Sequence, residues 1–149
     1  MNRSNFLRLF LVLVVLLSSI FITNKNIFSA NWVFLGQVAP DKTDFYYDKA
    51  SITVLSSDIK KVWLKFVFPI KKIIEERKNF GFPLTGFSSY SHSLSLAEID
   101  CKKQKYRGLN LITYSKNGAI LESINTEGSK PESIPPGSMI ERLHKAICP

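Results

Sequence analysis

Hydrophobic and polar residues alternate along most of the chain after residue 31, and this period of two predicts β-strands. The strongest example is 61–68, where every second residue from Val62 to Phe68 is apolar and the residues between them are mixed. Shorter apolar or β-branched runs at 32–35, 45–47 and 52–55 are expected to be strands as well. A sheet with one apolar face and one mixed face is expected to be covered on one side only.

The alternation continues in the second half of the chain. Residues 94–101 predict a strand that places Cys101 on the same side as Ala97 and Ile99. The clearest hairpin joins 106–114 to 119–125 through Asn117-Gly118, a pair preferred in type I′ turns. We expect this turn to set Thr113 opposite Glu122 and Tyr114 opposite Leu121.

Two segments have helical spacing instead. Isoleucines at 70, 73 and 74 followed by Arg77 predict one or two helical turns, and the Gly- and Pro-containing stretch up to residue 93 is expected to be an irregular loop. Near the end of the chain, Ser138 and Glu141 form a capping box before an apolar stripe at Ile140, Leu143 and Ile147. A helix of about nine residues does not persist alone, so we expect it to dock on the sheet.

Residues 1–30 differ from the rest and have the pattern of an export signal. Arg3 and Arg8 precede an uncharged apolar stretch at 9–22, and the small residue Ala30 ends the segment. Fourteen residues cover about 21 Å as a helix, which is less than the roughly 30 Å of a hydrocarbon core. We therefore expect a cleaved signal peptide at 1–30, with an uncleaved N-terminal anchor as the alternative, and one domain at 31–149.

The composition excludes several classes of protein. The chain has 149 residues, of which 45% are hydrophobic and 21% charged, so it is neither disordered, collagen-like nor a polytopic membrane protein. Neither glycine-rich phosphate-binding motif occurs, and we expect no cofactor. Two Cys and two His are too few for a zinc array.

The two cysteines, Cys101 and Cys148, both lie in the part expected to be exported. Outside the cytosol, two lone cysteines in one domain predict a disulfide. The alternatives are a zinc site with His92 and His144, whose spacing fits no common zinc finger, and two free thiols. The export-signal pattern at 1–30 predicts an extracytoplasmic location, meaning periplasm, cell surface or medium.

Catalytic residues are not expected. Ser138, His144 and Asp100 would be the members of a triad, but Ser138 serves better as a helix cap and no G-x-S-x-G elbow occurs. His92, in a serine-rich stretch, is expected to be an exposed loop residue. A secreted enzyme therefore stays the weakest of three functional hypotheses.

Basic residues provide the candidate binding surface. The formal net charge is +8, and lysine greatly outnumbers arginine after residue 30. Such residues usually form a solvated face, but they also attract anionic surfaces such as polysaccharides or lipid headgroups, in a salt-sensitive way. Nucleic acid is not an expected partner of an exported protein. The candidate residues are Lys60, Lys61, Lys71, Lys72, Lys102, Lys103, Lys105 and Arg107.

The aromatic residues Trp32, Trp63, Tyr46 and Tyr47 allow two interpretations: most of them are core residues, or they line a ligand groove. A cleft lined by Trp63 and Tyr47 would favour a periplasmic accessory domain or a small-ligand-binding domain. Any membrane contact is expected only through an uncleaved N-terminal segment. An exposed edge strand would allow two copies to pair as a homodimer.

The order of these features resembles the surface-adhesin protein E family of exported bacterial proteins. The resemblance covers nearly all of 32–148. It is carried by Trp32, Tyr46-Tyr47-Asp48, Ser51-Ile52, Val62-Trp63, the run from Glu98 to Cys101, Arg107, Tyr114 with Gly118, Pro136-Gly137-Ser138 and Cys148.

This resemblance implies an α+β fold with a mostly antiparallel sheet of about six strands. It also implies a C-terminal helix that a Cys101–Cys148 disulfide ties to the sheet. The implied role is that of an exported, non-enzymatic interaction module, with host extracellular-matrix proteins or an anionic envelope surface as partner. The chain departs from the family pattern in two ways: it lacks a lipidation cysteine, and 69–93 looks like an insertion.

Overall fold

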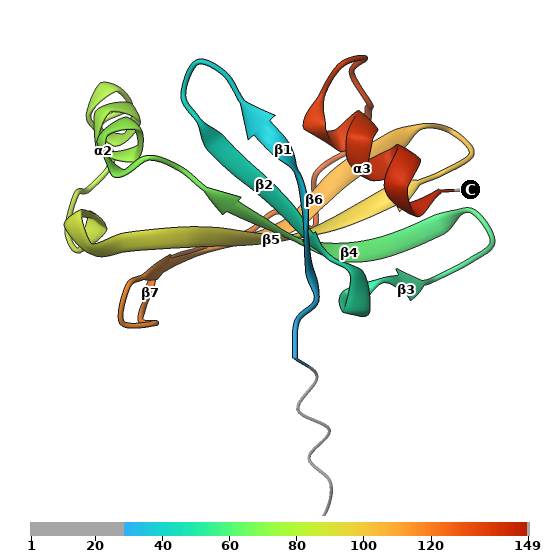
Figure 1. The fold of residues 1–149 in the computed structure, drawn as a ribbon, viewed down its shortest axis with the longest axis horizontal. Coiled ribbons are helices and arrows are strands. Elements are labelled where there is room, and N and C mark those ends of the chain that lie inside the picture. The colour runs from blue at the N-terminus through green and yellow to red at the C-terminus, as the bar shows by residue number, and fades with distance from the viewer. Residues whose placement is uncertain (1–28, 149) are drawn as a thin grey trace, which may run out of the picture.

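The computed structural model describes residues 29–148 as a twisted sheet with two α-helices (Figure 1). The expected signal peptide at 1–30 therefore lies almost entirely outside the described residues. In chain order the elements are β1 (Trp32–Val38), β2 (Thr43–Asp48), the 3-10 turn η1 (Lys49–Ser51), β3 (Thr53–Val54), β4 (Ile59–Val67), α2 (Ile70–Asn79), the 3-10 turn η2 (Phe87–Ser89), β5 (Tyr90–Asp100), β6 (Lys105–Ser115), β7 (Ile120–Asn125), β8 (Glu132–Ser133) and α3 (Met139–Ile147).

The strands form one antiparallel sheet in the order β1-β2-β4-β5-β6-β7, with the short strand β3 beside β4 and β8 beside β6. Both helices lie on the same side of this sheet, and no helix of the described range covers the other side (Figure 1). The predicted α+β fold, with a mostly antiparallel sheet and a C-terminal helix, is confirmed. Within residues 29–148, neither helix has the length and apolar character needed to cross a membrane.

The hydrophobic core lies between α3 and the middle of the sheet. Alternation along β4 places Val62 and Leu64 on the covered face, as the sequence pattern predicts, and both are buried. They pack with Ala97 and Ile99 of β5 and with further buried side chains. The other members of this core are Tyr47, Leu143 and Ile147.

The helix α3 begins at the predicted cap. Ser138 Oγ accepts a hydrogen bond from the Glu141 N–H at 3.1 Å, and the Glu141 carboxylate accepts one from the Gly137 N–H at 2.7 Å. The Glu141 carboxylate also pairs with Lys145, and this contact, followed by the Gly137 hydrogen bond, holds the pKa of Glu141 below its usual value. The capping box therefore sets the start of α3, and its apolar stripe then turns toward the core.

The end of α3 is tied to the sheet by the predicted disulfide between Cys101 and Cys148, whose Cα atoms are 5.5 Å apart. A second contact supports it, since His144 Nε2 and the Cys101 carbonyl lie 3.0 Å apart in a hydrogen bond. Both sulfurs are bonded to one another, so the zinc-site and free-thiol alternatives are wrong.

The hairpin between β6 and β7 departs from the predicted turn. Thr113 lies opposite Glu122 as predicted, but Tyr114 lies opposite Ile120 and not Leu121. Gly118 has φ +82°, whereas Asn117 does not adopt a positive φ, so the turn is not type I′. With one left-handed residue the loop gains a bulge, and this bulge shifts the register by one residue.

Residues 69–93 are more regular than expected. The helix α2 has ten residues and not one or two turns, and β5 begins at Tyr90 and not at residue 94. The serine-rich start of β5 fits a strand because Ser93 Oγ and Thr113 Oγ1 of the neighbouring strand share a hydrogen bond at 3.1 Å. Polar side chains that bond to one another across two strands are compatible with burial.

Replacement of Cys148 by Ser is expected to lower the free energy of unfolding by about 2–5 kcal/mol, because the closed loop of 47 residues is lost from the unfolded state. Denaturant unfolding under oxidising conditions measures this change. The wild-type protein reduced with dithiothreitol serves as the control and should reach the same midpoint. An unchanged unfolding curve would contradict the expected role of the bridge.

Candidate functional site

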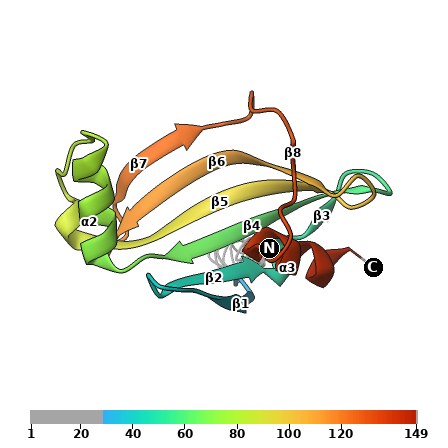
Figure 2. The same cartoon turned by 90° about the horizontal axis from the view of Figure 1, so that it is seen from above.

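Six of the eight basic candidate residues come together at one end of the sheet. Strand pairing brings β4, the β5–β6 turn and β6 side by side there, since Lys61 pairs with Glu98 and Asp100 pairs with Lys105. In Figure 2 this turn lies at the right and α2 at the left. We call this group the basic end: Lys60, Lys61, Lys102, Lys103, Lys105 and Arg107.

Three of the six cations in the basic end already have partners within the protein. Arg107 Nε contacts Glu98 Oε1 at 2.8 Å, and this hydrogen bond raises the pKa of Arg107. Lys103 lies 3.7 Å from the Asp100 carboxylate, and Lys60 donates to the Ile147 carbonyl at the end of α3, where a cation is favoured. These three cations therefore have local partners.

Lys61, Lys102 and Lys105 differ from them. No ion pair or side-chain hydrogen bond within residues 29–148 involves their ammonium groups. Lys102 and Lys105 are also exposed. The basic end therefore has three ammonium groups without a partner in the described residues, and two of them belong to exposed lysines.

Lys71 and Lys72 do not belong to this group, because they lie on α2 at the other end of the sheet (Figure 2). Lys72 pairs with Asp41 and lies 3.6 Å from Glu76, and the hydrogen bond to Asp41 raises the pKa of Lys72. Lys72 thus links α2 to the β1–β2 turn, while Lys71 is exposed.

Trp63 and Tyr47 do not line a common cleft, so the observation that would favour a small-ligand-binding domain is not made. Tyr47 is buried and pairs with Leu64 on the covered face. Trp63 precedes Leu64 on the same strand, so its side chain lies on the opposite face. Of the four aromatic residues considered, only Tyr47 is a buried core residue. On the open face, the Lys65 ammonium lies 4.7 Å from the ring centroids of both Trp32 and Tyr46, within the range of a cation–π contact.

His92 also lies on this open face, on β5 and not in a loop. Its ring stacks on Tyr114 with a centroid distance of 5.2 Å. Burial lowers the pKa of His92, and the nearby Lys65 charge lowers it further. A pKa below the ordinary value of about 6.5 keeps this imidazole neutral at pH 7.

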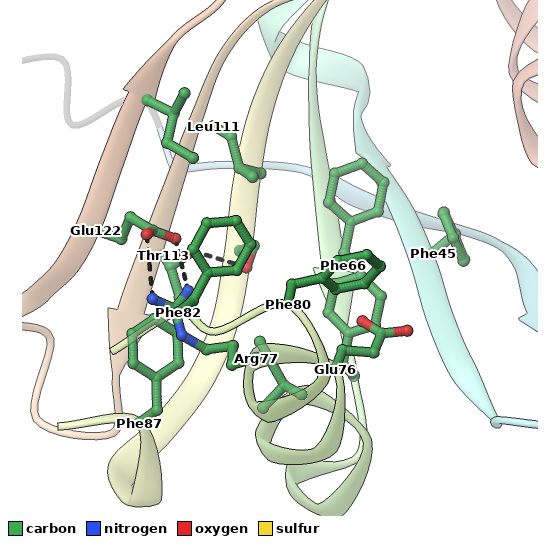
Figure 3. Close-up of a pocket in the computed structure, with 14 residues that line it drawn as sticks. Phe45, Phe66, Glu76, Arg77, Phe80, Phe82, Phe87, Leu111, Thr113 and Glu122 are labelled. Carbon is green, nitrogen blue, oxygen red and sulfur yellow. Dashed lines mark hydrogen bonds and ion pairs between the residues drawn. The ribbon is translucent and has the colours of Figure 1, made fainter. Parts of the chain in front are cut away.

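A cavity of about 450 Å³ lies on the covered face, beside the core (Figure 3). The sheet provides its floor, and α2 with the loop that follows it provides its wall. We call this cavity the aromatic trough. Its floor residues are Phe45, Phe66, Ser93, Leu111, Thr113, Glu122 and Ile124, and Arg77, Phe80, Phe82 and Phe87 belong to its wall.

An ion pair between Arg77 and Glu122 closes one side of the aromatic trough (Figure 3). The two Arg77 terminal nitrogens lie 3.0 and 3.3 Å from the two Glu122 oxygens, and Arg77 Nε donates to the Pro83 carbonyl at 2.8 Å. The guanidinium also lies 3.7 Å from the Phe87 ring centroid. Arg77 therefore connects α2, its loop and the edge strand β7.

Local sequence patterns did not predict this site, although a signal was present. Phe80, Phe82 and Phe87 lie in a stretch expected to be an irregular loop, and three phenylalanines are unusual in a solvated loop. Arg77 appeared only as one position of a helical repeat. Its partner Glu122 lies 45 residues away, so only the folded chain brings the two together.

The imagined catalytic triad does not assemble. Ser138 caps α3, His144 contacts the Cys101 carbonyl, and Asp100 accepts a hydrogen bond from the Lys103 N–H at 2.8 Å. Each of the three side chains has a separate structural partner. Within residues 29–148, no three His, Cys, Asp or Glu side chains are grouped in a way that would hold a metal ion.

Comparison with protein families gives one match, to the model described as surface-adhesin protein E, over residues 32–149. The matched range begins at the first residue of β1 and includes both helices, the aromatic trough and both cysteines. Comparison with the curated proteins and with the solved structures gives no match.

Glu122→Gln is expected to lower the free energy of unfolding by about 2 kcal/mol, because the largely buried Arg77 loses its counter-charge. Urea unfolding measures the change. Lys145→Gln removes the cation from the exposed pair with Glu141, leaves the capping box in place and provides the control, with a much smaller effect. Equal losses in the two variants would show that the Arg77 pair does not stabilise this end of the fold.

Proposed function

Because the chain belongs to the surface-adhesin protein E family, we propose that it is an exported adhesin-like module that binds an anionic partner through the basic end. The observation that carries the proposal is the gathering of six candidate cations at one end of the sheet, where three of the ammonium groups have no partner within residues 29–148. The partner is an acidic polysaccharide or the acidic surface of an extracellular-matrix protein.

Two features support an extracytoplasmic compartment. The disulfide between Cys101 and Cys148 is typical of proteins that fold outside the cytosol. The pattern of residues 1–30 is that of an export signal, which leads a chain to such a compartment. We therefore place the folded domain in the periplasm, on the cell surface or in the medium.

The chemistry of the basic end favours a diffuse anionic surface. Its unpaired cations are lysines, which act as point charges and lack the planar fork with which arginine binds a single phosphate or carboxylate. Its only arginine, Arg107, is occupied by Glu98. Attraction of this kind is long-range and weakens as salt is added.

The function does not require catalysis. The serine, histidine and aspartate that the sequence offered for a triad stabilise α3 and the β5–β6 turn. We therefore assign the chain to binding and not to hydrolysis. The alternative, a periplasmic small-ligand-binding domain, is not supported by a Trp63–Tyr47 cleft but gains support from the aromatic trough.

The triple variant Lys61→Gln, Lys102→Gln, Lys105→Gln is expected to weaken binding to immobilised heparin or dextran sulfate by about tenfold or more, since each cation near an anionic surface contributes favourably. Binding is measured by surface plasmon resonance over a series of salt concentrations. Wild-type affinity should fall steeply with salt, and the variant should depend on salt less.

The matched control is Lys71→Gln, Lys78→Gln, Lys116→Gln, which removes the same charge from exposed positions at the α2 end. It should bind almost as the wild type does. Equal loss in both triple variants would show attraction by net charge alone and contradict the assigned site. Absence of wild-type binding to sulfated polysaccharides and to matrix proteins at micromolar concentration would contradict the function.

A further inference from the structure

The aromatic trough exposes more apolar surface than a solvated loop and sheet edge normally do. The side chains of Phe80 and Phe82 are 75% and 55% exposed, and Ile124 on the floor is 43% exposed. Large apolar surface that stays accessible around a cavity is typical of a binding site. The volume of about 450 Å³ lies within the range of small-molecule sites.

The shape of the trough indicates an extended ligand. Its floor takes residues from five adjacent strands, from Phe45 on β2 to Ile124 on β7. Five strands span four inter-strand spacings, or about 19 Å. A volume of about 450 Å³ spread over this distance is narrow, so a single compact ring would leave most of the floor uncovered.

The polar groups of the trough are already paired. Ser93 and Thr113 share a hydrogen bond, and Arg77 is held by the Glu122 carboxylate and the Pro83 carbonyl. A ligand rich in hydroxyl or charged groups would lose its hydration here without gaining partners, which is unfavourable. Glu76 is the remaining acidic residue of the lining, and it disfavours an anionic head inside the trough.

We propose that the aromatic trough binds one unbranched hydrocarbon chain of a lipid or a free single-chain amphiphile, whose polar head stays in solvent. The site lies on the covered face near α2, away from the basic end, and its occupation does not depend on the function proposed above. Apolar contact with the phenylalanines supplies the affinity. The length of the floor favours an extended hydrocarbon chain over a compact ring.

Isothermal titration of the purified protein with lysophosphatidylcholines below their critical micelle concentrations tests the proposal. Affinity should rise with chain length from hexanoyl to decanoyl, by up to about fourfold for each added methylene group that the trough buries. In parallel, nuclear magnetic resonance should show shifts at the Leu111 and Thr113 amides. The indole N–H signals of Trp32 and Trp63, on the open face, should stay in place.

Ile124→Glu should weaken binding of the decanoyl probe by about tenfold or more, because it places a charge on the apolar floor. Ile120→Glu is the matched control on the same strand. Ile120 is 61% exposed and pairs with Tyr114 on the opposite face, so this variant should bind as the wild type does. Circular dichroism verifies that both variants are folded.

Two further measurements identify the source of the hydrocarbon chain. Binding of the monomeric probes without sedimentation on phosphatidylcholine vesicles supports a free amphiphile, and sedimentation that Ile124→Glu abolishes supports a membrane lipid. The proposal is overturned if no chain length binds and vesicles do not sediment the protein. It is also overturned if Ile124→Glu and Ile120→Glu bind equally, or if naphthalene binds as tightly as the decanoyl chain.

Discussion

The docking of α3 on the sheet is the contact on which the rest of the structure depends. A helix of nine residues is not stable alone, and a sheet with one uncovered apolar face is not stable in water either. Leu143 and Ile147 satisfy both requirements by packing on Val62 and Ile99, at about 1.5–3 kcal/mol for each large side chain that is fully buried. The disulfide then keeps the last turn of α3 in place.

The two ends of the covered face are completed in different ways. Under α3 the packing is continuous, with Ile99, Val62 and Leu143 among the most deeply buried side chains. Under α2 the contact is made by the long side chain of Arg77, which reaches across to β7 and leaves space beneath the helix. A buried guanidinium is tolerated there because Glu122 supplies the opposite charge and Phe87 supplies a ring face.

The sequence was most informative where structure is local. Alternation in β4 and β5 predicted the core face, and the Ser138 cap with its apolar stripe predicted α3 almost to the residue. The alternation of apolar and polar residues also predicted which segments are strands. The start of β5 was not predicted, because it depends on a hydrogen bond between Ser93 and Thr113 of two different strands.

The candidate sites were harder to predict because they are assembled from distant segments. Lysine runs were visible, but only the pairing of β4, β5 and β6 showed which runs share one end. The aromatic trough draws on five strands and α2, and no local pattern relates Arg77 to Glu122. Trp63 and Tyr47 do not share a cleft because their strand positions place the two side chains on opposite faces of the sheet.

The position of the disulfide has a mechanical consequence. Residues 101–148 form a covalent ring that contains β6, β7, β8 and α3, and Lys102 is the first residue after the bridge. Tension between the N-terminal side of the chain and a partner held at Lys102 would therefore stretch only the residues before Cys101 and leave the ring unloaded. The boundary between the two parts runs along the pairing of β5 with β6 and crosses the Arg77–Glu122 link, so the phenylalanine-lined cavity has residues of both the loaded part and the unloaded ring in its lining.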